Sequence, residues 1–352
     1  MINHQIYDTA TLLGVMRDDE MMQPPSNYWL SLCFPSVMNF TDEYIDFTKI
    51  TSNRKLAPLV VPTAQGVPIY SAAERMVRVK PAYVKPKDPV TASRMIKRAA
   101  GLGELAAPVA QTPAQRYNAI VADIMREHRR SIERRWEWMA AQAIIYGEVV
   151  LEDERYPRTV VDFDRAANHT VTLTGGDRWG QTGVSILRNV EAWRTRVRQA
   201  PFGGPTNRLT VGANVWDVMR EDEALMELMK VEIRDRNNGL ALNLGIREGL
   251  DVEFVGRLSG TLDVYVYSDY YQEPDGTTTP FMDPDDVVLT GPGVQGVRAF
   301  GAIQDKAANW QALAIFPKMW DEQDPSATFI MNQSAPLMVP VNPNNTLRAT
   351  VL

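Results

Sequence analysis

Few side chains of this chain are spaced for catalysis. Its three histidines, His4, His128 and His169, lie far apart in the sequence and in no metal-ligand spacing. Chain order alone does not rule out a Ser/His/Asp triad, but the G-x-S-x-G turn that exposes a nucleophilic serine is absent. His128 falls within a predicted helix, near its apolar face, and we interpret it as a hydrogen-bonded histidine at an interface, not as a catalytic one.

One segment matches the residue pattern of a dinucleotide-binding motif but lacks the structural context that the motif needs. Residues 101–106 (GLGELA) fit G-x-G-x-x-G/A, a pattern that works where a strand precedes it and a helix follows. The preceding residues 94–98 (RMIKR) do not have the pattern of a buried strand, and Pro108 stops a helix at once. We therefore interpret the segment as a loop.

Two acidic groups could bind a cation or act as acid and base. Residues 283–286 (DPDD) lack the glycine and the distal glutamate of a calcium loop, and we predict a turn there. Asp162 and Asp164 would share one face of a strand, with nothing beside them to support catalysis. The sequence therefore predicts no catalytic residue, no cofactor, no metal site and no enzyme activity.

Cys33 is the only cysteine of the chain. A single thiol excludes an intramolecular disulfide and a thiolate metal cluster. It leaves an interchain disulfide or a buried apolar thiol, and the neighbouring Leu32 and Phe34 favour burial.

Length and composition set wider limits. A chain of 352 residues suggests about two domains, and a net charge of −6 argues against a protein that reads nucleic acid through a basic surface. An acidic protein can still enclose nucleic acid. No stretch approaches the ~18 apolar residues of a membrane span, and the N-terminus lacks the pattern of a secretory signal. We expect a protein that stays in the cytoplasm where it is made, with no membrane partner.

Residues 1–49 are predicted to form an arm. A Pro-Pro pair at 24–25 blocks helix continuation. The apolar patch 28–35 (YWLSLCFP) is too short to make a core of its own, so we expect it to dock on another subunit. The residues predicted to make this contact are Tyr28, Trp29 and Phe34.

Residues 50–90 have the composition of a long hairpin interrupted by prolines. β-favouring pieces alternate with six prolines, and proline in strands is confined to edges and bulges. Two strands alone are marginal in water. The segment is therefore either a surface loop or an arm that folds onto a neighbouring subunit, where its basic residues would meet acidic partners. These basic residues are Arg75, Arg78, Lys80, Lys85 and Lys87.

The strongest helix signal spans 113–146. Thr112 can cap its start, Pro113 suits the first turn, and Gly147 suits the C-terminal cap. Such a helix is about 50 Å long at 1.5 Å per residue. Arg135 falls on its apolar face. Apolar residues recur at helical spacing, at Tyr117, Ile120, Val121, Ile124, Met125, Ile132, Trp136, Met139, Ala143 and Tyr146.

The same helix carries the densest basic run of the chain, residues 126–135 (REHRRSIERR). Between 113 and 147, six Arg face four Asp or Glu, so the net charge is only +2. One interpretation is a solvated face with pairs inside the helix; the other is weak, salt-sensitive contact with DNA phosphates. The residues predicted for that contact are Arg126, Arg130 and Arg134.

The rest of the chain mixes short strands and helices. Strands are expected at 159–163 and 170–173, with a helix at 190–198. A second unit at 201–324 has strands at 208–211, 252–255 and 262–271, a helix that begins near a capping Asn214 and ends at Met219, and a further helix at 224–235. Strand-like pieces at 328–331 and 347–352 follow, in a tail that we expect to rejoin the first domain.

Four motifs resemble, in order, segments of the major capsid proteins of lambda-like tailed phages, the capsid protein E family. Together the correspondences cover most of the chain, and four motifs with compatible spacing are specific where one is not. The motifs are residues 81–87 (PAYVKPK), residues 263–291 with their DVYVY, PFM and VLTG stretches, residues 296–305 (GVRAFGAIQD) and residues 332–338 (NQSAPLM).

The resemblance implies an α+β fold of the HK97 type. The long helix would be the spine of a peripheral domain and lie towards the shell interior. The implied parts are an N-terminal arm (1–49), an extended loop (50–90), a peripheral domain (91–200 plus 325–352, spine helix about 113–146) and an axial domain (201–324).

The resemblance also implies a function and partners. The protein would form pentamers and hexamers of an icosahedral shell in the virion, assembled in the host bacterial cytoplasm around double-stranded DNA as a precursor that expands. Its partners would be further copies of itself, a separate scaffolding protein, a portal protein, packaged DNA bound without sequence specificity, and a decoration protein where the phage has one. No large region precedes the arm, so we expect no fused scaffolding domain. We also expect stabilisation without covalent cross-links.

Two alternatives stay open at this point. One is the shell protein of an encapsulin-like cellular compartment with the same fold. The other is an α/β enzyme with an unrecognised site.

Overall fold

The computed structural model describes most of the chain. The described residues are 7–9, 11–13, 27–42, 44–50, 74–90, 113–153, 156–223, 225–229, 252–273, 275–322 and 327–352.

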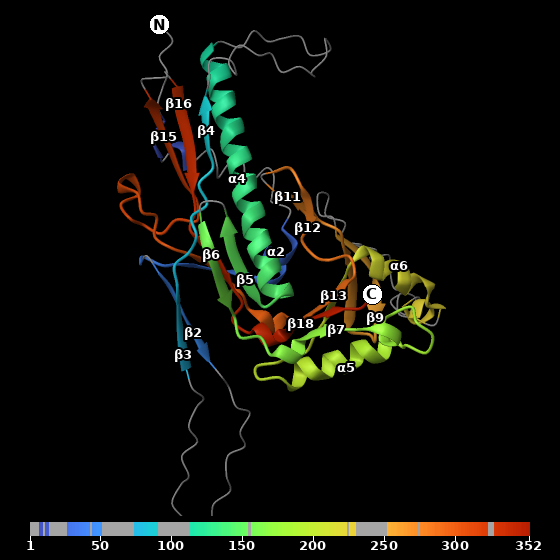
Figure 1. The fold of residues 1–352 in the computed structure, drawn as a ribbon. Helices are drawn as coiled ribbons and strands as arrows, with labels where there is room; N and C mark the ends of the chain where they lie inside the picture. Colours follow the sequence, from blue (N-terminus) through green and yellow to red (C-terminus); the bar gives the residue numbers. More distant parts are fainter. Residues whose placement is uncertain are drawn as a thin grey trace, which may run out of the picture.

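A single long helix, α4 (Pro113–Ile145), forms the axis of the subunit (Figure 1). Its apolar stripe is buried as predicted, for example at Val121, Ile132 and Met139, because residues three and four apart fall on one face. The helix ends before Gly147, whose φ of 77° is the left-handed conformation that favours glycine. Thr112, the predicted cap, lies outside the described residues.

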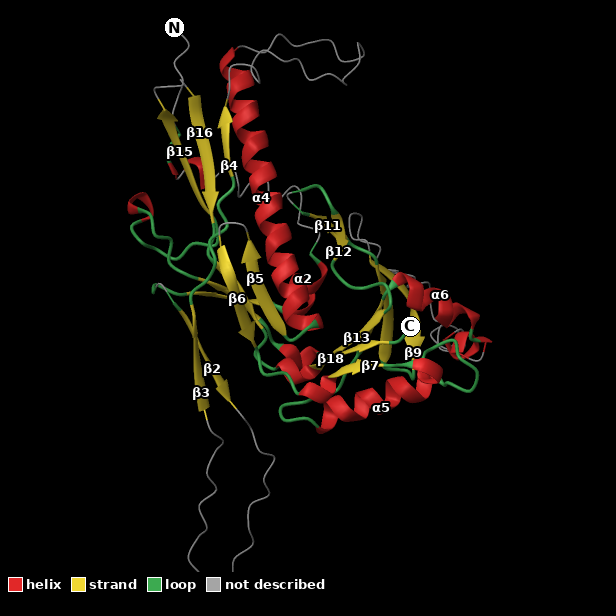
Figure 2. Ribbon diagram, in the orientation of Figure 1, coloured by secondary structure: helices red, strands yellow, loops and turns green. Residues whose placement is uncertain are grey.

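A six-stranded sheet lies at the C-terminal end of α4, in the order β7-β18-β13-β8-β10-β9. Two helices, α5 (Ile186–Gln199) and α6 (Ala213–Glu221), pack on this sheet, and α5 contributes Val190, Trp193 and Val197 to the core between them (Figure 2). The strands are β7 (Thr170–Thr172), β8 (Arg208–Val211), β9 (Val252–Leu258), β10 (Leu262–Tyr267), β13 (Asp286–Thr290) and β18 (Thr346–Thr350).

Two three-stranded sheets and three hairpins complete the strands that the structure describes. One sheet joins β1 (Ser36–Asn39), β14 (Val297–Phe300) and β17 (Pro336–Val339). The other joins β15 (Phe316–Glu322), β16 (Ala327–Gln333) and β4 (Lys87–Val90), beside the N-terminal half of α4 (Figure 1). The hairpins pair β2 (Ile45–Ile50) with β3 (Glu74–Val79), β5 (Glu148–Asp153) with β6 (Tyr156–Asp162), and β11 (Tyr270–Gln272) with β12 (Thr278–Pro280).

Short helical segments connect these elements. The arm contains α2 (Tyr28–Cys33), which packs on α4. The 3-10 turns are η1 (Ala167–His169), η2 (Gly175–Asp177), η3 (Pro292–Val294), η4 (Lys306–Ala308) and η5 (Pro343–Asn345).

Most expected elements are present, and two details differ. α6 begins after Gly212, so Asn214 lies inside the helix and does not cap it; its side-chain amide donates to Asp285 Oδ1 at 2.8 Å. The strand expected at 262–271 ends at Tyr267 and a new strand, β11, begins at Tyr270; in the gap between them, Asp269 pairs with Arg134 of α4. The helix expected at 224–235 is described only at 225–229, which is helical.

The expected four-part division of the chain stays a prediction, and strand pairing adds detail to it. The C-terminal strand β18 lies between β7 and β13 in the six-stranded sheet. β15 belongs with β16 and β4 beside α4.

Candidate assembly surfaces

The aromatic patch of the arm is buried in its own chain. Trp29 and Phe34 have no exposed surface and Tyr28 is 5% exposed. The Tyr28 and Tyr267 rings stack 5.2 Å apart, and the Tyr28 hydroxyl lies 2.8 Å from Thr210 Oγ1. The expectation that this patch needs another subunit to cover it is therefore corrected. α4 and the six-stranded sheet cover it, through contacts that span more than a hundred residues of sequence.

Glu137 of α4 holds the arm in place. This carboxylate has no exposed surface; it accepts the Trp29 N–H at 2.7 Å on Oε1 and the Leu30 N–H at 2.9 Å on Oε2. These are amide groups in the first turn of α2, which has no side-chain cap of its own. Burial raises the pKa of Glu137 to about 7, against the two hydrogen bonds that lower it. The sequence analysis missed this residue, although a glutamate next to the apolar stripe of the helix was a signal.

Arg134 is engaged inside the subunit. Its guanidinium makes a bidentate pair with Asp269, at 2.8 and 2.6 Å, donates to the Tyr270 carbonyl, and lies 4.9 Å from the Phe281 ring centre. Asp269 is 4% exposed. The predicted role of Arg134 in DNA contact competes with this pair, because a bidentate carboxylate partner occupies the donors that a phosphate would need.

The other two predicted DNA contacts are more accessible. Arg126 is half-buried and pairs with Asp123 at 2.9 Å, one turn away on α4. Arg130 is exposed. All three arginines lie on α4, and Arg134 differs in its ion pair with Asp269, a residue outside that helix.

The five basic residues predicted for contact in segment 50–90 have different surroundings. Arg78 forms a bidentate pair with Asp46 across the β2–β3 hairpin, at 2.8 Å for each bond, and this pair lowers the pKa of Asp46. Lys85 lies 4.7 Å from the Tyr83 ring centre and Lys87 lies 3.9 Å from the Phe329 ring centre. Lys80 is exposed. Arg75 lies on β3, where its side chain is outside the description.

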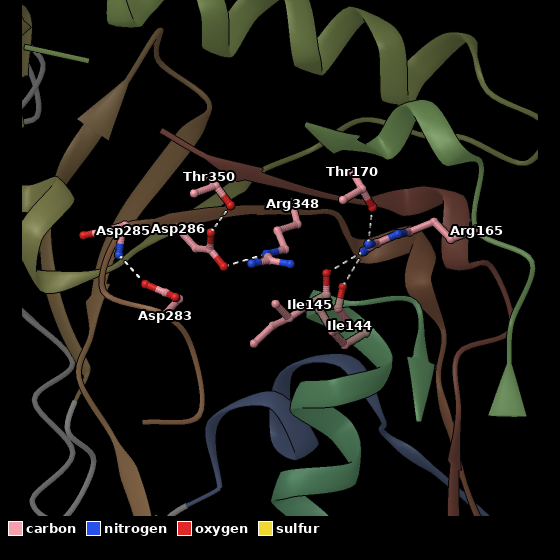
Figure 3. Close-up of polar contacts among 9 residues, drawn as sticks. All are labelled: Ile144, Ile145, Arg165, Thr170, Asp283, Asp285, Asp286, Arg348 and Thr350. Carbon is pink, nitrogen blue, oxygen red and sulfur yellow. Dashed lines mark hydrogen bonds and ion pairs between the residues drawn. The ribbon is translucent and has the colours of Figure 1, made fainter. Parts of the chain in front are cut away.

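The C-terminal end of α4 is fixed by an arginine (Figure 3). Arg165 donates to the carbonyls of Ile144 and Ile145 at 3.0 and 2.9 Å and to Thr170 Oγ1 at 2.9 Å. A cation at these carbonyls complements the negative end of the helix dipole. Burial, with the charge of Arg348 added, lowers the pKa of Arg165 to about 10.

Beside it, Asp286 of β13 joins the last strand to the sheet. The Asp286 carboxylate has no exposed surface; it accepts Arg348 Nε at 2.5 Å and Thr350 Oγ1 at 2.6 Å (Figure 3). Burial raises the pKa of Asp286 although these partners lower it. The adjacent 283–285 segment is a turn in which Asp283 Oδ1 accepts the Asp285 N–H at 3.0 Å.

The remaining residues considered in the sequence analysis, the cysteine, two histidines and an aspartate pair, are buried or hydrogen-bonded within the chain. Cys33 is 3% exposed and burial raises the pKa of its thiol to about 12, which fits the buried apolar thiol. His128 is buried with Nε2 3.0 Å from Asp88 Oδ2, and His169 is buried with Nδ1 2.9 Å from the Thr346 carbonyl. Asp162 accepts the Asp164 N–H at 2.8 Å.

Within the described ranges, no three His, Cys, Asp or Glu side chains form a group that could hold a metal. Nor is any described helix long and apolar enough to cross a membrane. The polar contacts described above join separate elements of the chain to one another.

The comparisons with known proteins agree on one family. The model of phage major capsid protein E matches residues 8–351. The chain belongs to this capsid protein E family. It is 27% identical over 347 residues to the major capsid protein of Escherichia phage lambda, covering 96% of this chain and 97% of that one. It is 26% identical over 344 residues to the major capsid protein of Enterobacteria phage P21, with the same coverage.

Solved structures support the fold. A prophage capsid protein from E. coli CFT073 superposes with a TM-score of 0.76 at 25% identity, over 99% of this chain and 100% of that chain. A subunit of the mature capsid of bacteriophage PhiM1 gives a TM-score of 0.50 at 10% identity, over 92% and 86% of the two chains, and shows the fold alone. The predicted HK97-type α+β fold and the predicted family are confirmed.

Proposed function

We propose that this chain is the major capsid protein of a lambda-like tailed phage and acts as a structural protein, not as an enzyme. The observation that carries the proposal is the match over residues 8–351, which leaves almost none of the chain for another activity. The match to the lambda protein covers 96% of this chain and 97% of that one, so the similarity is not confined to one domain.

The subunit has the form that a shell needs. α4 links the six-stranded sheet at one end to the β15-β16-β4 sheet at the other, and the β2–β3 hairpin projects from the body (Figure 1). Contacts made by different surfaces of identical subunits close into rings. We propose that these rings are pentamers and hexamers, held by many contacts that are individually weak.

The extended loop is proposed to contact a neighbouring subunit. Lys80 is exposed at the end of β3; Lys85 is exposed in the segment before β4, and Lys87 is exposed on β4. Arg75 lies on the same hairpin. Arg78 keeps an internal partner in Asp46, so we assign it to stiffening of the hairpin as well as to contact.

Contact with packaged DNA is proposed for Arg126 and Arg130, with Arg134 in a lesser role because Asp269 holds it. Such contact would be electrostatic and insensitive to base sequence. The net charge of −6 fits a protein that encloses DNA with few direct contacts.

The partners proposed beyond the chain itself are a separate scaffolding protein, a portal protein and, on the outside, a decoration protein. The shell would be a virion component assembled in the bacterial cytoplasm and stabilised without covalent cross-links. Cys33 supports the last point, since its buried thiol is inaccessible to a neighbour.

Sedimentation velocity tests the proposal, with the purified chain run alone and after co-expression with the scaffolding protein from the same gene cluster. We expect large particles in the second case. Denaturing mass spectrometry of those particles should return the single-chain mass, and covalent oligomers would contradict the non-covalent part of the proposal.

A further inference from the structure

Trp310 is the most exposed large hydrophobic residue among those described, with 61% of its surface accessible. It also has a φ of 55°, next to Asn309 with a φ of 50°. Bulky residues rarely adopt this left-handed conformation, and they keep it only where the surrounding structure enforces it. An indole held in this way at the surface calls for a function.

The loop that carries Trp310, residues 302–312, is anchored at its base by Asp305. Asp305 Oδ1 accepts the Ala307 N–H at 2.8 Å and so caps η4, while Oδ2 accepts Lys318 Nζ at 2.7 Å and Gln333 Nε2 at 3.3 Å. These partners lie on η4, β15 and β16. The loop is therefore fixed to the body at several points.

Apolar packing fixes the same loop from inside. Ile303 has no exposed surface and Ala308 is 5% exposed; both pack with Phe316 and Ala335. The Gln311 N–H donates to the Ala308 carbonyl at 3.0 Å, which closes the turn around Trp310. Trp310 is thus presented by an ordered loop, and an ordered aromatic side chain loses little entropy on binding.

A cavity of about 190 Å³ lies close to the base of this loop. Its wall is rich in aromatic and cationic side chains: the Arg135 guanidinium lies 5.1 Å from the Trp138 ring centre and Lys85 lies 4.7 Å from that of Tyr83. Glu152 and Asp153 supply carboxylates to the same wall. Aromatic rings and flat cations stack on an indole, and a carboxylate accepts its N–H.

Tyr83 connects the loop to the cavity. The Tyr83 hydroxyl donates to the Ala302 carbonyl at 2.6 Å, while Tyr83 also lines the cavity. The base of the loop that carries the indole therefore adjoins the face of the subunit on which the cavity opens. Two copies that meet through this face can each offer an indole to the other's cavity about a two-fold axis, or three copies can do so in a closed ring.

We propose that Trp310 of one copy inserts into the cavity lined by Tyr83, Trp138 and Tyr156 of a second copy. The inference rests on the proposed function, because only an assembling chain brings such faces together. It assigns to Trp310 the role of an aromatic anchor, the kind of residue that dominates the binding energy of an interface.

Cysteine cross-linking in assembled particles tests the contact directly. Cys33 is the only natural cysteine and is buried, so the two cysteines introduced in the double variant W310C/E152C are the accessible thiols. We expect oxidation of its particles to give covalent dimers or trimers on a denaturing gel. The pair W310C/E191C, with its second cysteine on α5, is the matched control and should stay monomeric.

A second variant separates the contact from the fold. Trp310→Gly removes the indole while glycine accepts the left-handed backbone, so the melting temperature of the unassembled subunit should not fall. We expect the apparent association constant for assembly to drop at least about tenfold, as for a central anchor.

The outcomes are distinct. Normal particles that show no W310C/E152C cross-link, or W310G subunits that assemble as the wild type does, would overturn the inference and leave the proposed function standing. Wild-type subunits that never assemble would overturn both. A cross-link to a different co-purified protein in place of a second copy would also overturn the inference.

Discussion

At the residue scale, the buried charges of this subunit tie distant parts of the chain together. Glu137 joins α4 to the arm, Arg134 joins α4 to the segment after β10, and Asp286 joins β13 to the last strand. Each charge is satisfied by partners far away in the sequence. Such pairs help to fix how the elements are arranged. If one partner is removed, the other charge stays buried without compensation, and its desolvation destabilises the fold.

Glu137 makes the stability of the subunit depend on pH. Its pKa is raised from 4.5, the ordinary value that also applies to the unfolded chain, to about 7 in the folded subunit. The folded state therefore binds this proton more tightly. The resulting contribution to the free energy of unfolding is full below pH 4.5 and is lost as the pH rises through 7. Between pH 5 and 8, wild type should lose about 2–3 kcal/mol of unfolding free energy relative to E137Q, which carries no charge at any pH. Urea unfolding of unassembled subunits at both values measures this, and parallel pH profiles for the two proteins would refute it.

Arg134 and Arg130 provide a matched pair on one helix. R134A leaves Asp269 buried without its bidentate partner, and we expect a loss of about 2–4 kcal/mol. R130A alters an exposed side chain and should cost less than about 1 kcal/mol. Denaturant titration compares them; equal effects would show that the Arg134–Asp269 pair is not what joins these elements.

At the element scale, α4 and its C-terminal cap organise the junction with the six-stranded sheet. Gly147 ends the helix in the left-handed conformation, and Arg165 then binds the last carbonyls. A Cβ at Gly147 would lie 2.9 Å from the Arg165 Cβ. The turn and the arginine therefore depend on each other.

Gly147→Ala should weaken this junction. The left-handed backbone and the contact with Arg165 together should cost about 1–3 kcal/mol. Gly176→Ala is the control, since a Cβ there meets no atom within 4 Å. Thermal melting of both variants gives the comparison, and a G147A melting temperature equal to that of G176A would contradict the assigned role of the cap.

Local sequence signals predicted the elements well but not their partners. Pro113 and Gly147 indicated the ends of α4, and residues 208–211 gave β8 with its observed bounds. The break between β10 and β11 was missed; Asp269 lies in this break, and its partner Arg134 lies 135 residues earlier, outside any local pattern. The sequence analysis expected Trp29 to be covered by another subunit; it missed the contacts within the same chain, since Glu137, which binds the Trp29 N–H, lies 108 residues later. Periodicity reports which face of an element is buried; it does not report what buries it.

At the scale of the whole molecule, a long helix links two sheets and a hairpin projects from the body. The surface also carries an exposed indole, at Trp310, and a cavity lined by aromatic residues. The family and the fold were predictable because four motifs keep their order along the chain. The assembly surfaces were less predictable. Apolar side chains in a short segment, here Tyr28, Trp29 and Phe34, were predicted to contact another subunit, and they are core residues of their own chain.

Electron microscopy of the chain co-expressed with its scaffolding protein tests the central claim most directly. The account predicts closed icosahedral shells whose surface resolves into rings of five and six subunits. A homogeneous monomer at every concentration, with and without the scaffolding protein, would contradict it.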